Sequence, residues 1–310
     1  MFTIKTKVLP IILILCGLWG IPLSASATEN GAPTTAMGLY GFGAGMLPPV
    51  TEYGTFGVRL ADYDSNRVMD GNGDKENNDF SLNVKALTLA YIRMTDKTIL
   101  GGQYGFGFAA PFFKMDSELE IFAGGMSVFQ DEAQVFRQAD LLFQPLMVQW
   151  HPSENLSING QFQILVPIGD YDKDRMVSPG LNHWAYSPII SLTYITDSGF
   201  EVSSTSELDV STRNKATGYR NGIEYRNEFA VGQHVGPWTL GVGGYYYDQL
   251  TDDSGPGSDD GNRARVLALG PSLQFFRRGL PPVWFHAYKE FDAHNRSEGY
   301  NISVRVAMSF

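Results

Sequence analysis

The chain ends with YNISVRVAMSF (residues 300–310), in which apolar and polar side chains alternate up to a terminal aromatic residue. A period of two places successive side chains on opposite faces of a β-strand, so one face is apolar and the other polar. This pattern is typical of the closing strand of an outer-membrane β-barrel, which faces lipid outward and a polar lumen inward. We expect the barrel-assembly machinery to depend on this strand. The expected assembly signal comprises Tyr300, Val306, Met308 and Phe310.

The N-terminus has the layout of a secretory signal peptide, which favours the outer membrane over a soluble sheet with an ordinary edge strand. Lys5 and Lys7 precede an apolar run at 8–18, and small residues follow at 25–27. The run is too short for a good spanning helix. We expect residues 1–27 to be a signal peptide and the mature chain to begin near Thr28. The single cysteine falls within the apolar run, so the mature chain has no disulfide framework and no thiolate chemistry.

The composition fits an exported barrel. No stretch after the signal approaches 18 consecutive apolar residues, which argues against spanning helices. Aromatic residues make up 13% of the chain and there are 34 glycines, as aromatic girdles and tight strand packing require. Without the two lysines of the signal, the net charge moves from −10 to −12. This acidity argues against nucleic acid as a partner.

Twelve candidate strands follow one another between residues 54 and 310. They are 54–63, 80–94, 98–113, 137–150, 156–167, 184–196, 199–210, 221–231, 238–250, 263–277, 282–291 and 299–310. Short connections alternate with long ones, as the two ends of an outer-membrane barrel require. The long outer loops are expected at 64–79, 114–136, 168–183, 211–220, 251–262 and 292–298. The sequence therefore predicts an all-β protein, a transmembrane antiparallel up-and-down β-barrel of about 12 strands.

Three segments leave this count and the strand phases open. The strands at 80–94 and 137–150 show no clear choice between their two faces. Segment 117–130 would either add strands or fold within an outer loop.

Charged side chains fall at inward positions of several strands. Charge at mid-strand is tolerated where it faces a wet or internally paired lumen. The residues expected to line the lumen are Glu201, Glu207, Asp209, Glu224, Arg226, Glu228 and Arg305. Two interpretations remain open. The charges form an ion-pair network that fills the barrel, or they line a pore and set its selectivity for solutes.

Residues 28–53 precede the first strand and contain an apolar, glycine-rich stretch at 36–47. An apolar segment left in water would be a liability, so we expect it to fold into the lumen as a plug or gate. The gate candidates are Leu39, Tyr40, Phe42, Met46 and Leu47. The alternatives are that the segment extends the first hairpin or packs under the barrel.

Six short motifs occur in one order along the mature chain. They are LPP (47–49), TDKTILG (95–101), GDYD (169–172), GYYYDQLTDD (244–253), ALGP (268–271) and KEF (289–291). With these motifs the chain resembles the outer-membrane family named for the meta-cleavage pathway of phenol degradation. The resemblance implies a barrel in the bacterial outer membrane, and a transporter linked with the catabolism of aromatic compounds.

No catalytic or metal motif stands out. The five histidines are scattered, and neither zinc-ligand spacing nor a G-x-S-x-G elbow occurs. The acidic loop at 70–76 departs from a calcium loop at Lys75, where glycine is expected. We therefore expect no enzyme, cofactor or metal, with calcium binding by this loop left open.

The sequence favours a passive outer-membrane channel for small hydrophobic, including aromatic, solutes. The expected partners are outer-membrane lipids, lipopolysaccharide, the barrel-assembly machinery and the solute. A barrel enzyme acting on lipids, with His286 as its candidate histidine, and a structural surface barrel with a closed lumen are the alternatives.

Overall fold

The computed structural model describes residues 27–258 and 260–310, so the predicted signal peptide lies almost entirely outside the described residues. Within these ranges the chain forms thirteen strands and one 3-10 helix, η1 (Glu29–Gly31). The strands are β1 (Thr55–Met69), β2 (Asn78–Ile99), β3 (Gly102–Ala123), β4 (Met126–Gln138), β5 (Leu141–Ser153), β6 (Leu156–Val166), β7 (Ala185–Ile195), β8 (Phe200–Ser211), β9 (Glu224–Val235), β10 (Trp238–Gln249), β11 (Arg265–Phe275), β12 (Val283–His294) and β13 (Arg296–Ser309). No helix in the described part of the chain is long and apolar enough to span a membrane.

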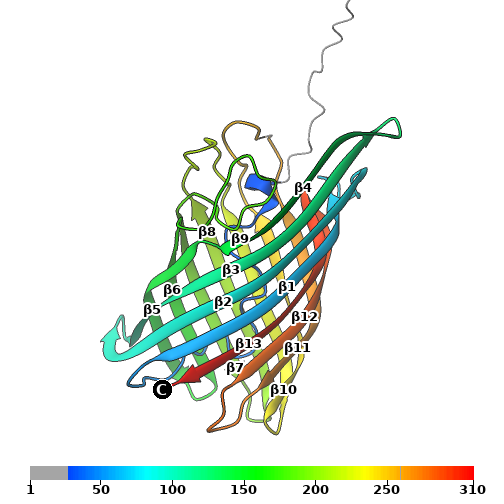
Figure 1. The fold of residues 1–310 in the computed structure, drawn as a ribbon. Helices are drawn as coiled ribbons and strands as arrows, with labels where there is room; N and C mark the ends of the chain where they lie inside the picture. The colour runs from blue at the N-terminus through cyan, green and yellow to red at the C-terminus, as the bar shows by residue number, and fades with distance from the viewer. Residues whose placement is uncertain (1–26, 259) are drawn as a thin grey trace, which may run out of the picture.

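The strands form one closed antiparallel barrel (Figure 1). β1 pairs with both β2 and β13, so the first and last strands close the wall. β3 pairs with β5 over residues 103–109 and with β4 over residues 112–123. β4 and β5 therefore follow one another in a single strand position, interrupted at Ala139 and Asp140. In the described residues the barrel has twelve strand positions, which confirms the fold predicted from the sequence.

The segment at 114–136 is not the outer loop that the sequence suggested. It continues β3 and then forms β4, and together they make a hairpin that projects beyond the barrel (Figure 1). Charged residues at 114, 116, 118 and 120 alternate with less polar ones, so the period of two is present. The charges stand on the outward face, where a lipid-facing strand would be apolar. A strand that projects beyond the membrane needs no apolar outer face, and this is why the segment resembled a loop.

The inward and outward faces follow the predicted alternation where one face is clearly apolar. On β13, Ile302 and Met308 are exposed, whereas Asn301 and Ser303 are buried inside. β2 was ambiguous because both of its faces are apolar. Its inner face carries Leu82, Val84 and Ala86, and its outer face carries Leu87 and Leu89.

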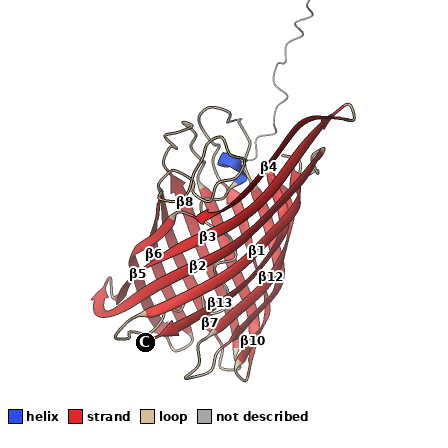
Figure 2. Cartoon of the chain, viewed as in Figure 1, coloured by secondary structure: helices blue, strands red, loops and turns tan. Residues whose placement is uncertain are grey.

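The two ends of the barrel differ. The C-terminus lies at the end with short turns, and the long loops and η1 lie at the opposite end (Figure 2). In an outer-membrane barrel the short turns face the periplasm and the long loops face the exterior.

Candidate functional site

The N-terminal segment runs through the lumen from the outer end to the periplasmic end. At the outer end, the Ala27 N–H donates to the carbonyl of Asn295 at 3.0 Å. At the periplasmic end, the Tyr53 N–H donates to the carbonyl of Phe310 at 3.0 Å. Residues 28–47, which we call the plug, make hydrogen bonds to inward side chains between these points. The N-terminal segment thus lies inside the lumen. It neither extends the first hairpin nor packs under the barrel.

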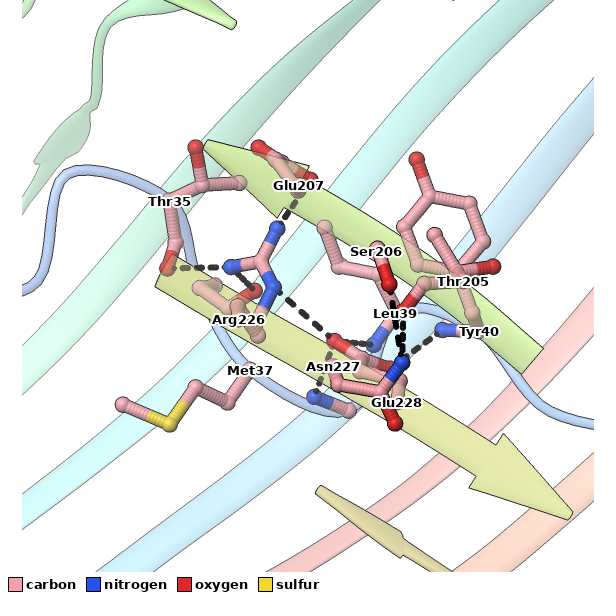
Figure 3. A network of polar contacts seen from close by, with 12 residues as sticks. Thr35, Met37, Leu39, Tyr40, Thr205, Ser206, Glu207, Arg226, Asn227 and Glu228 are labelled. Carbon is pink, nitrogen blue, oxygen red and sulfur yellow. Dashed lines mark hydrogen bonds and ion pairs between the residues drawn. The ribbon is translucent and has the colours of Figure 1, made fainter. Parts of the chain in front are cut away.

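Arg226 on β9 is the centre of a buried ion network around the plug (Figure 3). Its guanidinium pairs with Glu207 of β8, and its Nε lies 3.3 Å from Oε1 of Glu228. Its Nη1 donates to the carbonyls of Thr35 and Ala36 at 2.8 and 2.9 Å. The three charged side chains are at most 2% exposed, so water screens their interaction little.

Glu228 binds the next part of the plug through backbone donors. Its Oε1 accepts from the N–H groups of Gly38 and Leu39 at 3.1 and 3.3 Å, and its Oε2 accepts from Tyr40 at 2.7 Å (Figure 3). Gly38 has a φ of +73°, and a Cβ there would lie 2.8 Å from Nε2 of His286. Glycine is therefore required where the plug turns to present successive N–H groups to one carboxylate.

Other inward residues bind the plug above and below this centre. Glu224 accepts from the Thr34 N–H at 2.9 Å, and Glu201 accepts from the Gly43 N–H at 2.7 Å. Asp209 accepts from the Thr35 hydroxyl at 3.4 Å. Hydrogen bonds to charged groups typically contribute about 1.5–3 kcal/mol each. The structure thus brings the acidic residues expected in the lumen together around the plug.

Arg305 lies on β13, four strand positions from β9, and binds the same turn of the plug. Its Nη1 donates to the carbonyl of Leu39 at 2.7 Å, and its guanidinium stacks over Trp284 at 4.3 Å from the ring centre. Arg59, its neighbour on β1, donates to the carbonyl of Gly38 at 2.9 Å. In this turn a carboxylate thus accepts hydrogen bonds from the N–H groups, and guanidinium groups donate hydrogen bonds to the carbonyls.

The gate candidates occupy successive levels of the lumen. Phe42 is 1% exposed, and its carbonyl accepts from Nε1 of Trp284 at 2.9 Å. Leu47 donates its N–H to Oε1 of Gln149 at 2.6 Å, whereas Met46 is 44% exposed near the periplasmic end. Gly45 lies so close to β7 that a Cβ would be 2.3 Å from the backbone nitrogen of Thr193.

Sequence reasoning missed several residues that bind the plug. They are Arg59, Gln149, Asn159, Trp284 and Asn301. Arg59 had a usable signal, since it is an inward charge on the first strand like Arg305 on the last. The neutral side chains, three amides and the indole of Trp284, had none, because neutral polar side chains are ordinary in any barrel lumen.

A cavity of about 240 Å³ lies between the outer half of the plug and the wall formed by β1–β3. On one side it meets the plug at residues 29–37. The wall side is largely apolar and is lined by Leu82, Val84, Ala86, Pro111, Phe113, Met115, Leu142 and Leu165. Val177 of the outer loop at 167–184 packs against Met115 and closes part of this side.

A polar group of residues borders the cavity on the side of β12 and β13. The hydroxyls of Tyr63 and Tyr245 each donate to Glu290 at 2.8 Å. The Arg296 guanidinium lies 3.6 Å from the same carboxylate. The cavity therefore combines an apolar wall with a buried polar end.

The geometry around His286 does not match a hydrolase triad. The Ser303 hydroxyl lies 3.3 Å from Nδ1 and 3.2 Å from Nε2 of this ring, so it is in line with neither nitrogen, and the Asn301 amide oxygen lies 3.2 Å from Nε2. A triad places the nucleophile in line with one ring nitrogen and an orienting carboxylate at the other. The ring also stacks on Tyr288 with centres 4.1 Å apart, beneath Gly38 of the plug. For residues 27–258 and 260–310, no group of three or more His, Cys, Asp or Glu side chains is placed to hold a metal ion.

Comparison with known proteins identifies relatives of the chain. The model of the family described as "MetA-pathway of phenol degradation" matches residues 65–306. The crystal structure of an outer-membrane channel from Pseudomonas putida F1 is similar, with a TM-score of 0.72 and 16% identity over 85% of this chain and 97% of that one. The β-domain of the Bordetella autotransporter BrkA gives a TM-score of 0.48 and 10% identity over 84% and 100% of the two chains. No curated protein sequence matches the chain.

Proposed function

The chain belongs to this phenol-degradation family of bacterial outer-membrane barrels, and from that premise we propose that it is a passive channel for small hydrophobic, including aromatic, solutes. In this proposal the cavity between the plug and β1–β3 is the outer binding site. The plug is the gate that a solute passes on its way to the periplasm. No step of this function requires a catalytic residue.

The apolar wall of the cavity is the observation that carries the proposal. A lumen that conducts water and ions has polar inward residues along its strands. The inner faces of β6, β8 and β9 follow that rule, whereas those of β2 and β3 present Val84, Ala86 and Phe113 to the cavity. Such a surface favours an apolar solute, because each Å² of apolar surface buried away from water contributes about 25 cal/mol of favourable free energy.

The size of the cavity indicates a small solute. Pockets for drug-sized ligands commonly measure about 300–1,000 Å³. A cavity of about 240 Å³ fits a molecule of one ring with small substituents. The buried polar group around Glu290 would favour a solute with one polar substituent.

The experiment introduces a large side chain that projects from the apolar wall into the cavity. Ala86→Phe adds a ring on the inner face of β2, so uptake of a labelled monocyclic aromatic into vesicles carrying the purified protein should fall several-fold. Ala110→Phe is the matched control, because Ala110 lies opposite the exposed Leu89 on the outward face of the β2–β3 pair. Both variants must retain heat-modifiable mobility. Unchanged uptake by the folded Ala86→Phe variant would contradict the proposal.

A further inference from the structure

At its outer end, the plug makes a buried contact with one carboxylate. The backbone nitrogen of Thr28 lies 2.9 Å from Oδ2 of Asp253, which belongs to the loop between β10 and β11. Thr28 is 2% exposed and Asp253 is 7% exposed. This loop is therefore tied to the plug at the point where the mature chain is expected to begin.

Asp253 is surrounded by hydrogen-bond donors. Its Oδ1 accepts from the Gly222 N–H at 2.7 Å and from Nε2 of Gln249 at 2.6 Å, and its Oδ2 also accepts from the hydroxyl of Tyr219. Neutral donors alone compensate a buried carboxylate only in part. The neighbouring Asp252, by contrast, pairs with Arg263 at 2.7 Å. For the part of the chain that the structure describes, Asp253 has no ion pair with a basic side chain.

The backbone of Thr28 is strained while a residue precedes it. Its φ is 65° and its ψ is 154°, a combination that a β-branched residue rarely adopts. The φ angle is defined by the peptide bond between Ala27 and Thr28. Hydrolysis of that bond removes the restriction, and Thr28 then keeps its position without the strain.

We propose that the bond between Ala27 and Thr28 is hydrolysed during export and that Asp253 binds the α-ammonium group so created. A signal peptidase adds water across this bond. Ala27 leaves with the signal as a carboxylate, and its hydrogen bond to Asn295 is lost with it. The nitrogen of Thr28 takes up protons to become the ammonium. The hydrogen bond at 2.9 Å thereby becomes a buried ion pair.

The ion pair fixes the outer end of the plug in the external loops. Glu29 adds to it, since its carboxylate accepts from the Thr217 hydroxyl at 2.6 Å and from Nδ2 of Asn214 at 2.8 Å. Processing thus completes the anchor, because a chain with a residue before Thr28 has a neutral amide at this place. The inference concerns the anchoring of the plug and stands apart from the choice of solute.

The first measurement is the intact mass of the protein purified from outer membranes. We expect the mature chain to begin at Thr28. A mature chain that begins at any other residue would overturn the proposal, because no α-ammonium would then lie beside Asp253.

The second measurement uses the chemistry of an N-terminal threonine. Periodate cleaves its Cα–Cβ bond to give a glyoxylyl group when the amine is free and accessible, and an aminooxy reagent then reports the product. The native protein should react at least tenfold more slowly than the unfolded protein. Asp253→Asn should remove most of this protection. Asp260→Asn, an exposed position in the same loop, is the control and should keep it.

The folded state of each variant is checked by heat-modifiable mobility. If Asp253→Asn does not fold, a glycine inserted between Ala27 and Thr28 replaces it as the test. The new terminus is then glycine, which periodate does not cleave, so its amine is labelled with an activated ester near neutral pH. We expect faster labelling of this amine than of the wild-type one. Equal rates for the tested variant and the wild type, or no protection in the native wild type, would overturn the proposal.

Discussion

Arg226 and Glu228 lie two residues apart on the inner face of β9 and bind opposite polarities of the plug backbone. Arg226 donates to the carbonyls of Thr35 and Ala36, and Glu228 accepts from the N–H groups of residues 38–40. The pair is also ionic, with 3.3 Å between Nε and Oε1. The backbone of the plug is therefore hydrogen-bonded through both its C=O and its N–H groups, as it would be beside a neighbouring strand. Here charged side chains provide these hydrogen bonds in place of a backbone.

Replacing Arg226 with Met should destabilise the protein by about 3–5 kcal/mol, because it leaves Glu207 and Glu228 buried without their cation. The measurement is the free energy of unfolding in urea, with the protein in detergent. Lys173→Met is the control, since Lys173 and its partner Asp174 are 55% and 77% exposed, so loss of this pair should change stability far less. Equal losses for the two variants would contradict the central role of Arg226.

The sequence sufficed for the barrel because its strands repeat a simple physical pattern. A strand such as β13, with lipid on one face and a polar lumen on the other, shows its phase directly. The pattern fails for β2, whose inner face is apolar at Val84 and Ala86, and for the projecting part of β3, whose outer face is charged at residues 114, 116, 118 and 120. Both exceptions occur where the surroundings differ from the usual lipid and water.

The lumen could be predicted only in part. The inward phase of Glu228 and Arg226 was readable from the alternation, but their partners are backbone groups of residues 35–40. Backbone N–H and C=O groups are the same in every residue, so no pattern of side chains reveals that contact. The glycines of the plug were the available signal, and Gly38 is the one that the geometry requires most clearly.

Ile302→Arg should destabilise the barrel by about 2–4 kcal/mol, because Ile302 faces lipid and is 46% exposed. From the alternation alone, Ser303→Arg should be tolerated as a change toward the lumen. The structure corrects this expectation, since Ser303 is 6% exposed and its hydroxyl lies 3.2 Å from His286. We now expect Ser303→Arg to impair folding as well, through overpacking. Urea unfolding in lipid vesicles measures the stability of both variants. An unchanged free energy of unfolding for Ile302→Arg would mean that residue 302 lies outside the bilayer.

Deleting Phe310 should lower the amount of folded protein in the outer membrane. Its N–H donates to Gly54 at 3.1 Å, and its ring packs on Phe56 with centres 6.1 Å apart, so it helps to close β13 on β1. Membrane fractionation with heat-modifiable mobility gives the folded amount. Phe310→Tyr is the control and should assemble normally. Wild-type levels after the deletion would remove Phe310 from the assembly signal.

Acid should loosen the outer loop at 167–184. His183 in this loop is 2% exposed, and burial lowers its pKa to about 4 from the ordinary 6.5. A histidine buried in its neutral form stabilises the folded loop above pH 6.5, and this stability is lost as the pH falls from 6.5 to 4. The loss reaches about 3 kcal/mol. Hydrogen exchange of the loop, corrected for intrinsic rates, should rise over that range. In His183→Leu the exchange should not depend on pH there, and an unchanged dependence would exclude His183 as the cause.

Deleting residues 36–47 tests whether the plug controls the lumen. The barrel should still form, because the deletion leaves intact all thirteen strands that the structure describes. It removes the backbone partners of Glu228 and Arg305 and one of the two backbone partners of Arg226, so that these charges would be exposed to water.

Two changes in permeation are expected, according to how the plug acts. A steric plug predicts a raised conductance in planar bilayers. The open lumen should then prefer cations weakly, because the carboxylates of Glu201, Glu207, Asp209, Glu224 and Glu228 outnumber the guanidinium groups of Arg59, Arg226 and Arg305. A gate that binds solute predicts instead a loss of aromatic uptake with little change in ion current.

Deletion of the exposed turn at Gly124 and Gly125, at the tip of the β3–β4 hairpin, is the control and should alter neither property. If deleting residues 36–47 also changes neither conductance nor uptake, the plug is not the gate. If, in addition, Ser303→Ala or His286→Ala abolishes hydrolysis of a phospholipid substrate, the protein is a barrel enzyme that acts on lipids, and the channel proposal fails. The second result requires the Ser303 hydroxyl to move into line with one nitrogen of the His286 ring, which Gly38 of the plug covers, so removing the plug should then raise the hydrolytic rate.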